Sequence, residues 1–334
     1  MNRKTKIFLV IILGILVFFI TINVIPPKKV VTDNPFIIGK DERPLIAAHR
    51  GGKNLRPENT LLAIDFSYEN FNVDIIEMDL YLTKDEYLIL SHNSTINSYT
   101  ELKDQEKYYI KDHTLAEIQQ FNFGFQFEKD GTYPYRNILD GVEESEKSQV
   151  LLENKLRVLT LNELFDKYAK TSVKYIIEIK NSGELGLKAV DILVKLLNEY
   201  DVVKKVCVGT FKDEVEKYLS DKYPDVLRGA SMSVAAKFII TEMFKVNLFD
   251  GSTFSALQIP TSYTLELNDK DVLTLNLSKK TYVKRAHRRG MSVQYWTIND
   301  KEEMIEVIKL GADVIMTDNP DVLYEVLKEM GYFS

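Results

Sequence analysis

Short apolar runs alternate with helical patterns along most of this chain, and this alternation constrains the fold more than any other feature. Apolar residues follow helical spacing over Leu185–Tyr200 and Thr281–Arg289, between runs that we interpret as buried strands. The clearest of those runs are Lys174–Lys180, Val206–Phe211, Ala256–Pro260, Ser292–Ile298 and Ala312–Thr317. Strands that alternate with helices over about 280 residues predict a parallel α/β fold, and this length suits a (β/α)8 TIM barrel.

The number of strand candidates exceeds the eight places of such a barrel by one. Val226–Ser231 and three runs between Ile46 and Leu90 bring the candidates to nine. The link Thr83–Glu86 is too short for the crossover helix that parallel neighbours require. We therefore expect residues 75–92 to contain a hairpin or a strand outside the regular barrel.

Two segments fall outside the repeating pattern. Residues from about 99 to 155 are polar, aromatic and weakly periodic around one helix near Thr114–Phe121. We interpret them as a small insertion above one end of the barrel. Residues 26–44 carry prolines and mixed charges with little periodicity, which is typical of a linker. The predicted catalytic domain accordingly covers residues 45–334.

The N-terminal part of the chain resembles a membrane anchor. Residues 7–25 carry no charge, and as a helix of about 28 Å they are long enough to cross a bilayer. Three basic residues lie within residues 1–6, which favours a cytoplasmic N-terminus and export of the rest, although two lysines also follow. A cleaved signal peptide is the alternative, but this segment exceeds a usual apolar core and has no small-x-small cleavage site. We predict a single-pass anchor in the cell membrane, with an extracytoplasmic catalytic domain.

Composition excludes two classes of protein. The formal net charge is −6, and residues 1–44 are themselves basic, so the remainder is still more acidic and lacks a nucleic-acid footprint. Cys207 is the one cysteine, which excludes an internal disulfide and a thiolate metal cage. Any metal site must therefore use oxygen or imidazole ligands.

Carboxylates occur where a buried strand should be apolar. Glu77 and Asp79 alternate with apolar residues, so both point to the same face of one strand. Burying two like charges costs several kcal/mol per ion unless a cation compensates them, and a hard divalent metal is a natural compensation. Glu178, two residues before Lys180 on another strand, adds a third carboxylate. The alternative is a buried salt-bridge cluster with Lys180 and Arg50.

Two histidines accompany these carboxylates. His49 and His92 each end an apolar run, and the carboxyl ends of barrel strands form the active face. A single histidine at such a position is often structural, but two beside acidic residues favour acid/base chemistry. Gly51 and Gly52 either cradle a phosphate or simply make a turn.

The order of these motifs closely resembles that of the glycerophosphodiester phosphodiesterase family. The matching segments are His49–Gly52, Pro57–Thr60, Glu77–Asp79, His92, Glu178–Lys180, Trp296–Asn299 and Thr317–Pro320. The resemblance implies a barrel of the phosphatidylinositol-phospholipase type with an insertion after the second histidine. It also implies metal-dependent hydrolysis of glycerophosphodiesters or lysophospholipid-type phosphodiesters, which releases an alcohol and a glycerol phosphate.

The resemblance also implies a role for each site residue. The implied roles are metal ligands for Glu77, Asp79 and Glu178, general base and acid for His49 and His92, phosphate binding for Arg50 and Lys180, pocket lining for Trp296, and orientation of neighbouring groups for Glu58. Trp296 fits a core aromatic equally well, and Glu58 fits a carboxylate at a helix N-terminus. One divalent metal is expected, with Ca²⁺ slightly favoured over Mg²⁺ because Ca²⁺ is plentiful outside the cytoplasm.

Two departures from the family pattern bear on the substrate. Asn93 replaces the usual Asp after the second histidine, and Leu159 replaces a usual proline. We expect a phosphodiester small molecule or lipid head group as substrate. The alternatives are a lysophospholipase D, a phosphoinositide-specific phospholipase-like enzyme, or a catalytically silent, membrane-anchored binding protein on the same fold.

Overall fold

The computed structural model describes residues 2–25, 27–246, 248, 251, 253–267 and 270–333, of which 232, 265–267 and 270–273 are described by their backbone alone. Met1 of the predicted cytoplasmic segment and Pro26 of the predicted linker lie outside the described residues. So do Ser334 and a few positions of the predicted catalytic domain between 247 and 269.

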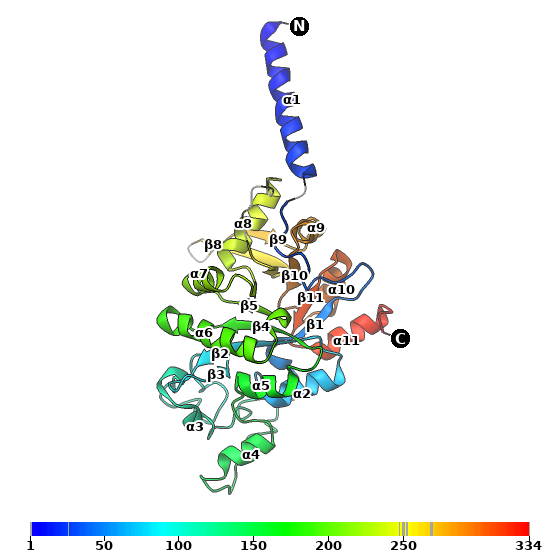
Figure 1. Ribbon diagram of the computed structural model, residues 1–334. Coiled ribbons are helices and arrows are strands. Elements are labelled where there is room, and N and C mark those ends of the chain that lie inside the picture. Colours follow the sequence, from blue (N-terminus) through cyan, green and yellow to red (C-terminus); the bar gives the residue numbers. More distant parts are fainter. Residues whose placement is uncertain are drawn as a thin grey trace.

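Eight parallel strands form a nearly closed barrel, which confirms the predicted fold (Figure 1). They are β1 (Leu45–Ala48), β2 (Ile75–Leu82), β4 (Lys174–Ile179), β5 (Val206–Gly209), β6 (Leu227–Arg228), β7 (Ala256–Ile259), β10 (Ser292–Tyr295) and β11 (Val314–Thr317). Their order around the barrel is β6-β5-β4-β2-β1-β11-β10-β7. A parallel bridge between Gly229 and Ala256 connects the two ends of this order.

The ninth strand candidate is a hairpin partner, as the short link predicted. β3 (Leu88–Leu90) pairs antiparallel with β2, so that Leu80 faces Leu90. Thr83 closes the turn, because its side-chain hydroxyl accepts a hydrogen bond from the Tyr87 N–H at 2.9 Å. A second antiparallel pair, β8 (Ser262–Leu267) with β9 (Lys270–Asn276), was not expected from the sequence.

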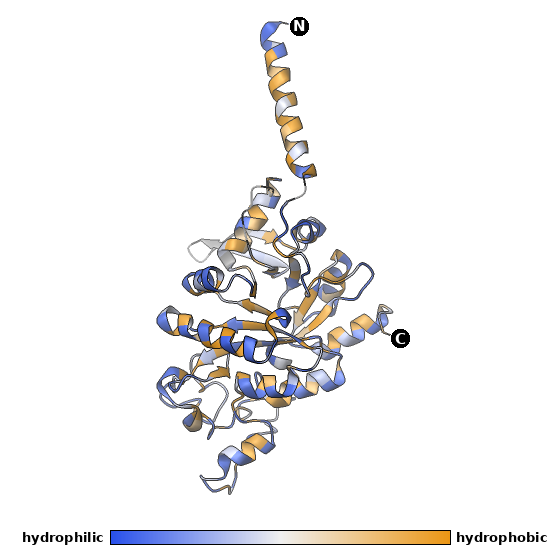
Figure 2. Ribbon diagram, in the orientation of Figure 1, coloured by the Kyte–Doolittle hydropathy of each residue, from blue (hydrophilic) through white to orange (hydrophobic). Residues whose placement is uncertain are grey.

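Helices cover the outside of the barrel and turn their apolar sides toward it, whereas α1 is hydrophobic on all sides (Figure 2). The α-helices are α1 (Arg3–Val24), α2 (Leu61–Asn70), α3 (Leu115–Ile118), α4 (Lys147–Glu153), α5 (Leu161–Tyr168), α6 (Gly183–Glu199), α7 (Asp213–Lys222), α8 (Met232–Met243), α9 (Lys280–Arg288), α10 (Lys301–Leu310) and α11 (Pro320–Glu329). Short 3-10 turns occur at η1 (His49–Gly51), η2 (Ile110–Asp112) and η3 (Val203–Lys205).

The barrel interior is filled from one end by a residue of the predicted linker. Phe36 is 1% exposed and packs among side chains that face the barrel axis, including Ala47, Ile75 and Val314. The Asn34 side chain donates hydrogen bonds to the carbonyls of Ser255 and Gly290, next to the beginnings of β7 and β10. This part of the linker is therefore packed against the barrel rather than extended away from it.

The insertion lies between β3 and α5 and has a small core of its own. Its buried side chains include Ile96, Ile110 and Phe123, and they pack together with Ile89 of β3. The helix expected near Thr114–Phe121 is the shorter α3, which begins with Thr114 as a capping-box residue. In Figure 1 this region lies at the end of the molecule opposite α1.

Candidate active site

The predicted site residues come together at the carboxyl ends of β1, β2 and β4. A cavity of about 300 Å³ is lined by His49, Arg50, Glu77, Asp79, His92, Glu178, Lys180 and Trp296, together with Lys53 and Gln258 among others. Glu58 lies in an adjoining cavity, which also contains Arg50 and Lys53. All nine residues predicted from the sequence thus lie in or beside one depression of the barrel mouth.

A tight turn after β1 places His49 and Arg50 over β2. Arg50, Gly51 and Gly52 all have positive φ values of 50°, 81° and 90°. A side chain at Gly52 would approach the Ser67 hydroxyl to 2.6 Å, so glycine is required there. The turn also directs the Arg50 backbone N–H to Glu77 Oε2 at 2.8 Å. The two glycines therefore make the turn that positions the histidine.

Three carboxylates line the cavity from neighbouring strands. Glu77 and Asp79 are only 4% and 1% exposed, and Glu178 of β4 pairs in register with Asp79. Burial, together with the charges of Asp79 and Glu178, raises the pKa of Glu77 to about 7, although His49 and the Arg50 backbone N–H oppose this shift. The groups around Glu77 therefore compensate the buried negative charge of the three carboxylates only in part.

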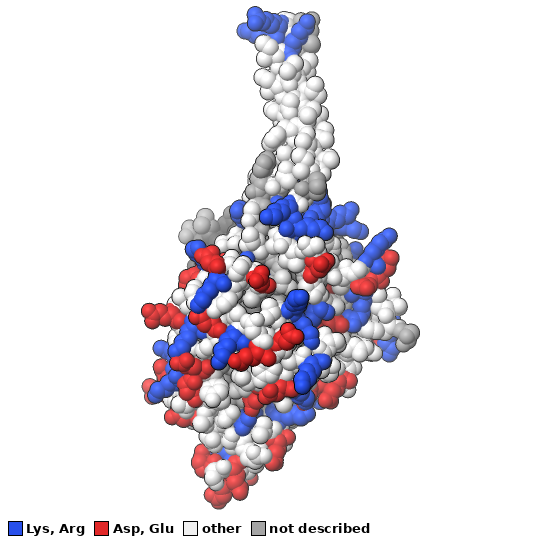
Figure 3. Space-filling model, in the orientation of Figure 1, with Lys and Arg blue, Asp and Glu red and all other residues white. Residues whose placement is uncertain are grey.

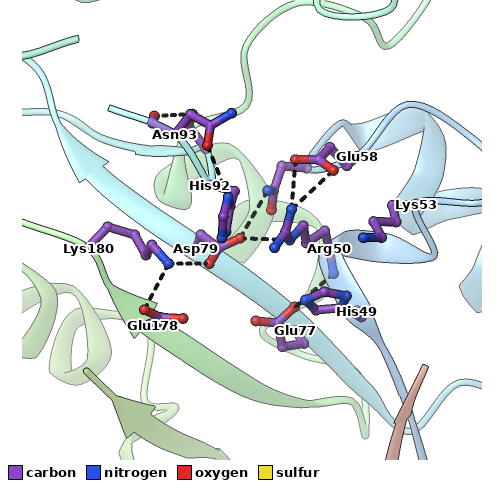
Figure 4. A network of polar contacts seen from close by, with 12 residues as sticks. His49, Arg50, Lys53, Glu58, Glu77, Asp79, His92, Asn93, Glu178 and Lys180 are labelled. Carbon is purple, nitrogen blue, oxygen red and sulfur yellow. Dashed lines mark hydrogen bonds and ion pairs between the residues drawn. The ribbon is translucent and has the colours of Figure 1, made fainter. Parts of the chain in front are cut away.

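Two basic side chains contact these carboxylates (Figure 4). Lys180 Nζ lies 2.9 Å from Glu178 Oε1 and 3.5 Å from Asp79 Oδ1. Arg50 Nε lies 3.3 Å from Asp79 Oδ2, and Arg50 Nη1 lies 3.2 Å from Glu58 Oε1. Among the residues that the structure describes, no three His, Cys, Asp or Glu side chains are grouped closely enough to hold a metal ion. Asp79 and Glu178 thus pair with Arg50 and Lys180, whereas Glu77 contacts the Arg50 backbone N–H and His49.

His49 is held by a carboxylate that the sequence did not single out. Its Nδ1 lies 2.5 Å from Asp318 Oδ1, and its Nε2 lies 4.0 Å from Glu77 Oε2. Burial disfavours the charged ring, but Glu77 and Asp318 outweigh it and raise the pKa of His49 above its ordinary value. These neighbours thus favour the imidazolium form of His49.

Asp318 is itself fixed by a second motif. The Asn299 side-chain amide donates to Asp318 Oδ2 at 2.7 Å, and Asn299 Oδ1 accepts from the Asp318 N–H at 2.9 Å. The strand register explains the contact with His49, since β11 pairs with β1 so that Thr317 faces Ala48. The residues that follow, Asp318 and His49, must then be neighbours.

His92 has a different setting at the end of β3. Its Nδ1 lies 3.1 Å from the side-chain oxygen of Asn93, whose backbone N–H donates to the Tyr99 hydroxyl at 2.9 Å. Burial, with the charges of Arg50 and Lys180, lowers the pKa of His92 below its ordinary value despite the opposing charge of Asp79. At neutral pH these surroundings favour the neutral ring. The Asn93 side chain thus contacts His92 at the position where the family pattern usually has an aspartate.

Trp296 lies between the cavity and the interior of the barrel. Its ring lines the cavity, 6.0 Å from that of Phe211 between centroids, and also packs against the side chains inside the barrel. Its indole Nε1 is buried and has no hydrogen-bond partner within the described part of the chain.

The chain is similar to known proteins over most of its length. Residues 49–322 match the model of the glycerophosphoryl diester phosphodiesterase family. A glycerophosphodiester phosphodiesterase of Caldanaerobacter subterraneus is 25% identical over 287 residues, which cover 86% of this chain and 99% of the relative. A human lysophospholipase D is 26% identical over 296 residues, which cover 84% of this chain and 85% of the relative.

A solved structure shows the same fold. An Oleispira antarctica phosphodiesterase, determined in complex with the product sn-glycerol-3-phosphate, superposes with a TM-score of 0.59 at 19% identity. The match covers 86% of this chain and 97% of that one.

Proposed function

The chain belongs to the glycerophosphoryl diester phosphodiesterase family, and on that premise we propose that it hydrolyses glycerophosphodiesters to an alcohol and a glycerol phosphate with His49 and His92 as acid/base catalysts. The observation that carries the proposal is one cavity that combines two histidines with opposite pKa shifts, two basic side chains and three carboxylates. The product-bound Oleispira phosphodiesterase on the same fold supports the choice of a glycerol phosphate product.

The basic side chains Arg50 and Lys180 bind the phosphate oxygens. Both lie in the cavity wall within 3.5 Å of a carboxylate, so an anionic substrate competes with Asp79 and Glu178 for them. Donors that face the charge that develops on the phosphoryl oxygens lower the barrier by several kcal/mol. This binding turns the ion pairs of the free protein into contacts with the substrate.

The three carboxylates fit a divalent cation. Their donor set consists of oxygens alone, as Ca²⁺ and Mg²⁺ require, and the raised pKa of Glu77 supports incomplete compensation of their charge. Glu77, Asp79 and Glu178 would hold one such ion once Lys180 has turned from Asp79 and Glu178 to the phosphate. A bound cation would supply Lewis-acid stabilisation of the phosphoryl charge, and Ca²⁺ is slightly favoured over Mg²⁺ for an extracytoplasmic enzyme.

The two histidines divide the proton transfers. One removes a proton from the nucleophile and the other protonates the departing alkoxide. Asp318 orients His49, because its contact with Nδ1 leaves Nε2 as the atom that faces Glu77 and the cavity. The nucleophile is either water or the neighbouring glycerol hydroxyl, and the second route gives a cyclic product first.

A lysophospholipase D is the second candidate, because a human relative carries that name. The adjoining cavity, of about 670 Å³, favours a polar alcohol instead of an acyl chain. Its wall includes Glu58, Asn93, Gln126, Glu128, Lys129 and Asp130, as well as Tyr99 and Phe127. With α1 in the cell membrane, the enzyme would act on deacylated head groups or glycerol-phosphate polymers outside the cytoplasm.

Hydrolysis by the purified full chain tests this proposal. We expect turnover of glycerophosphocholine to exceed that of lysophosphatidylcholine, to require Ca²⁺ or Mg²⁺, and to fall about 1,000-fold in His49→Ala and in His92→Ala. The matched control is His113→Ala, a histidine of the insertion that does not line the cavity. Full activity in excess chelator would contradict the requirement for a divalent cation. Normal rates in both histidine variants would contradict the acid/base roles of His49 and His92. Polyglycerol phosphate, as a third substrate, tests whether the enzyme also hydrolyses glycerol-phosphate polymers.

A further inference from the structure

The end of α1 is tied to the barrel by α9. Asn23 Oδ1 accepts a hydrogen bond from the Arg285 guanidinium, and the Arg288 guanidinium donates to the carbonyls of Asn23 and Ile25 at 3.0 Å. The Asn23 side chain also donates to the Lys245 carbonyl at 3.1 Å, just beyond the end of α8. Because the last carbonyls of a helix lack partners within it, Arg288 serves as a cap for α1. The ends of α1, α8 and α9 therefore lie together.

The length of α1 sets the depth of this junction. A helix of 22 residues is about 33 Å long, close to the roughly 30 Å of a bilayer's hydrocarbon core. The inference rests on α1 crossing the bilayer, for which its length and its apolar composition qualify it. Asn23 then lies at head-group depth, and so do Arg285, Arg288 and Lys245, which contact it.

Apolar side chains are exposed at the same level. Ile240, Met243 and Phe244 are 52%, 50% and 68% exposed. Their spacing of three and four residues places them on one face at the end of α8. Apart from α1 itself, few large apolar side chains among the described residues are as exposed. A contiguous apolar patch of this kind marks an interaction surface.

Positive charge surrounds this patch, although the chain as a whole is acidic. Figure 3 shows Lys and Arg side chains gathered at the base of α1. Lys28, Lys29, Lys245 and Lys284 are exposed there, and none of them has an ion-pair partner in the part of the chain that the structure describes. Arg285 instead pairs with Glu242 at 3.2 Å. The four lysines are thus available to an external anion.

A groove at this junction combines both kinds of side chain. It has a volume of about 500 Å³ and lies between the last turns of α1 and the helices α8 and α9. Phe19 and Ile20 form its apolar wall. Lys245 and Lys284 form its basic wall, together with Arg285, whose partner Glu242 also lines the groove. A phospholipid matches these two walls, because its acyl chains are apolar and its phosphate is negatively charged.

We propose that the junction of α1, α8 and α9 is a docking surface for the bilayer, and that its groove binds the head group of an anionic phospholipid. Phe244 and its apolar neighbours enter the interface, while Lys245 and Lys284 contact the lipid phosphate. Each basic residue near an anionic membrane adds a favourable attraction that salt weakens. The docked barrel is then held at a fixed orientation to the membrane, with α4 of the insertion farthest from it.

Single-cysteine variants of the full chain in nanodiscs test the docking. Cys207 is fully buried, so a thiol-reactive fluorophore labels only an introduced cysteine. We compare Phe244→Cys with Leu152→Cys, which is exposed on α4, and with Ile12→Cys in α1 as the membrane reference. Spin-labelled lipids should quench the fluorophore at 244 and at 12 but not at 152. Equal quenching at 244 and 152 would overturn the docking, and no quenching at 12 would remove its premise and overturn it too.

The same label tests the choice of lipid. At position 244, spin-labelled phosphatidylglycerol should quench more strongly than spin-labelled phosphatidylcholine. Replacing Lys245 or Lys284 with Ala should lower this preference about fivefold for each lysine. The control Lys195→Ala, at a 74% exposed side chain of α6, should leave it unchanged. Equal quenching by the two lipids in the unsubstituted background would refute the anionic-lipid site.

Discussion

The two histidines of the cavity are held in opposite ways. His49 is buried in the barrel wall and contacts the carboxylate of Asp318, and its pKa is raised. His92 is half-buried where the insertion begins and contacts the amide of Asn93, and its pKa is lowered. One site thus contains a ring that favours the charged form and a ring that favours the neutral form, as a pair that both donates and accepts protons requires.

Among changes that leave both histidines in place, the largest effect is expected from Asp318, the carboxylate that contacts His49 and not His92. Asp318→Asn should lower kcat about 100-fold or more, because an amide neither stabilises the imidazolium nor enforces the Nδ1–H form of His49. Steady-state kinetics on glycerophosphocholine measure this change. Asp221→Asn, at a side chain 65% exposed on α7, is the control. An unchanged kcat in Asp318→Asn would mean that the two histidines do not differ as described.

The contact between Asp318 and His49 could not be predicted from the sequence. Alternating patterns predicted the barrel, and the short link after Leu82 predicted the β2–β3 hairpin, because both signals are local. The contact of Asp318 with His49 depends on the β1–β11 register, which joins the two ends of the barrel. The burial of Phe36 likewise depends on side chains from several strands. Such long-range contacts leave no local pattern.

The ion pairs of the cavity show a second limit. The strand positions of Asp79, Glu178 and Lys180 were predictable from alternation, because residues two apart share a face. The position of the Lys180 ammonium between the two carboxylates was not, since a long side chain has several rotamers that the sequence does not distinguish.

A smaller effect is expected when the two histidines are made alike. Asn93→Asp places a carboxylate beside His92, which should raise the pKa of His92 because a negative charge stabilises the imidazolium. The pH profile of kcat/KM records this as a displacement of the limb that reports His92 toward higher pH, with kcat changed by about tenfold or less. The matched control is Asn97→Asp in the insertion. An unchanged pH profile in Asn93→Asp would contradict the assignment of that limb to the titration of His92.

The smallest effect concerns how the insertion, and with it His92, is attached to the barrel. Asp65 of α2 lies 2.5 Å from Lys155 at the end of the insertion and 2.6 Å from both Lys167 Nζ and the Tyr168 hydroxyl. Asp65→Asn should lower the free energy of unfolding by about 2 kcal/mol at neutral pH. Urea denaturation measures this loss, with Asp166→Asn as the control. Equal stability of Asp65→Asn and the unsubstituted chain would contradict the claim that Asp65 stabilises the attachment of the insertion to the barrel.

The pH dependence of this loss has a definite sign. Burial alone would raise the pKa of Asp65, but its hydrogen bonds with Lys155, Lys167 and Tyr168 lower the pKa overall. The stabilisation is therefore complete above the ordinary carboxyl pKa of about 3.9, and it is lost as the pH falls through the lower folded value. The difference between the unsubstituted chain and Asp65→Asn should accordingly vanish in strong acid.

The division of labour between the two histidines is the central claim, and the leaving group tests it most directly. In a p-nitrophenyl diester of glycerol phosphate, the leaving group is p-nitrophenolate, which departs without a proton. Hydrolysis of this substrate therefore bypasses the general acid but still needs the general base. We predict that one of His49→Ala and His92→Ala regains most of its lost rate with this substrate, whereas the other stays impaired. Equal impairment of both variants on p-nitrophenyl and choline diesters would contradict a site in which one histidine serves as acid and the other as base.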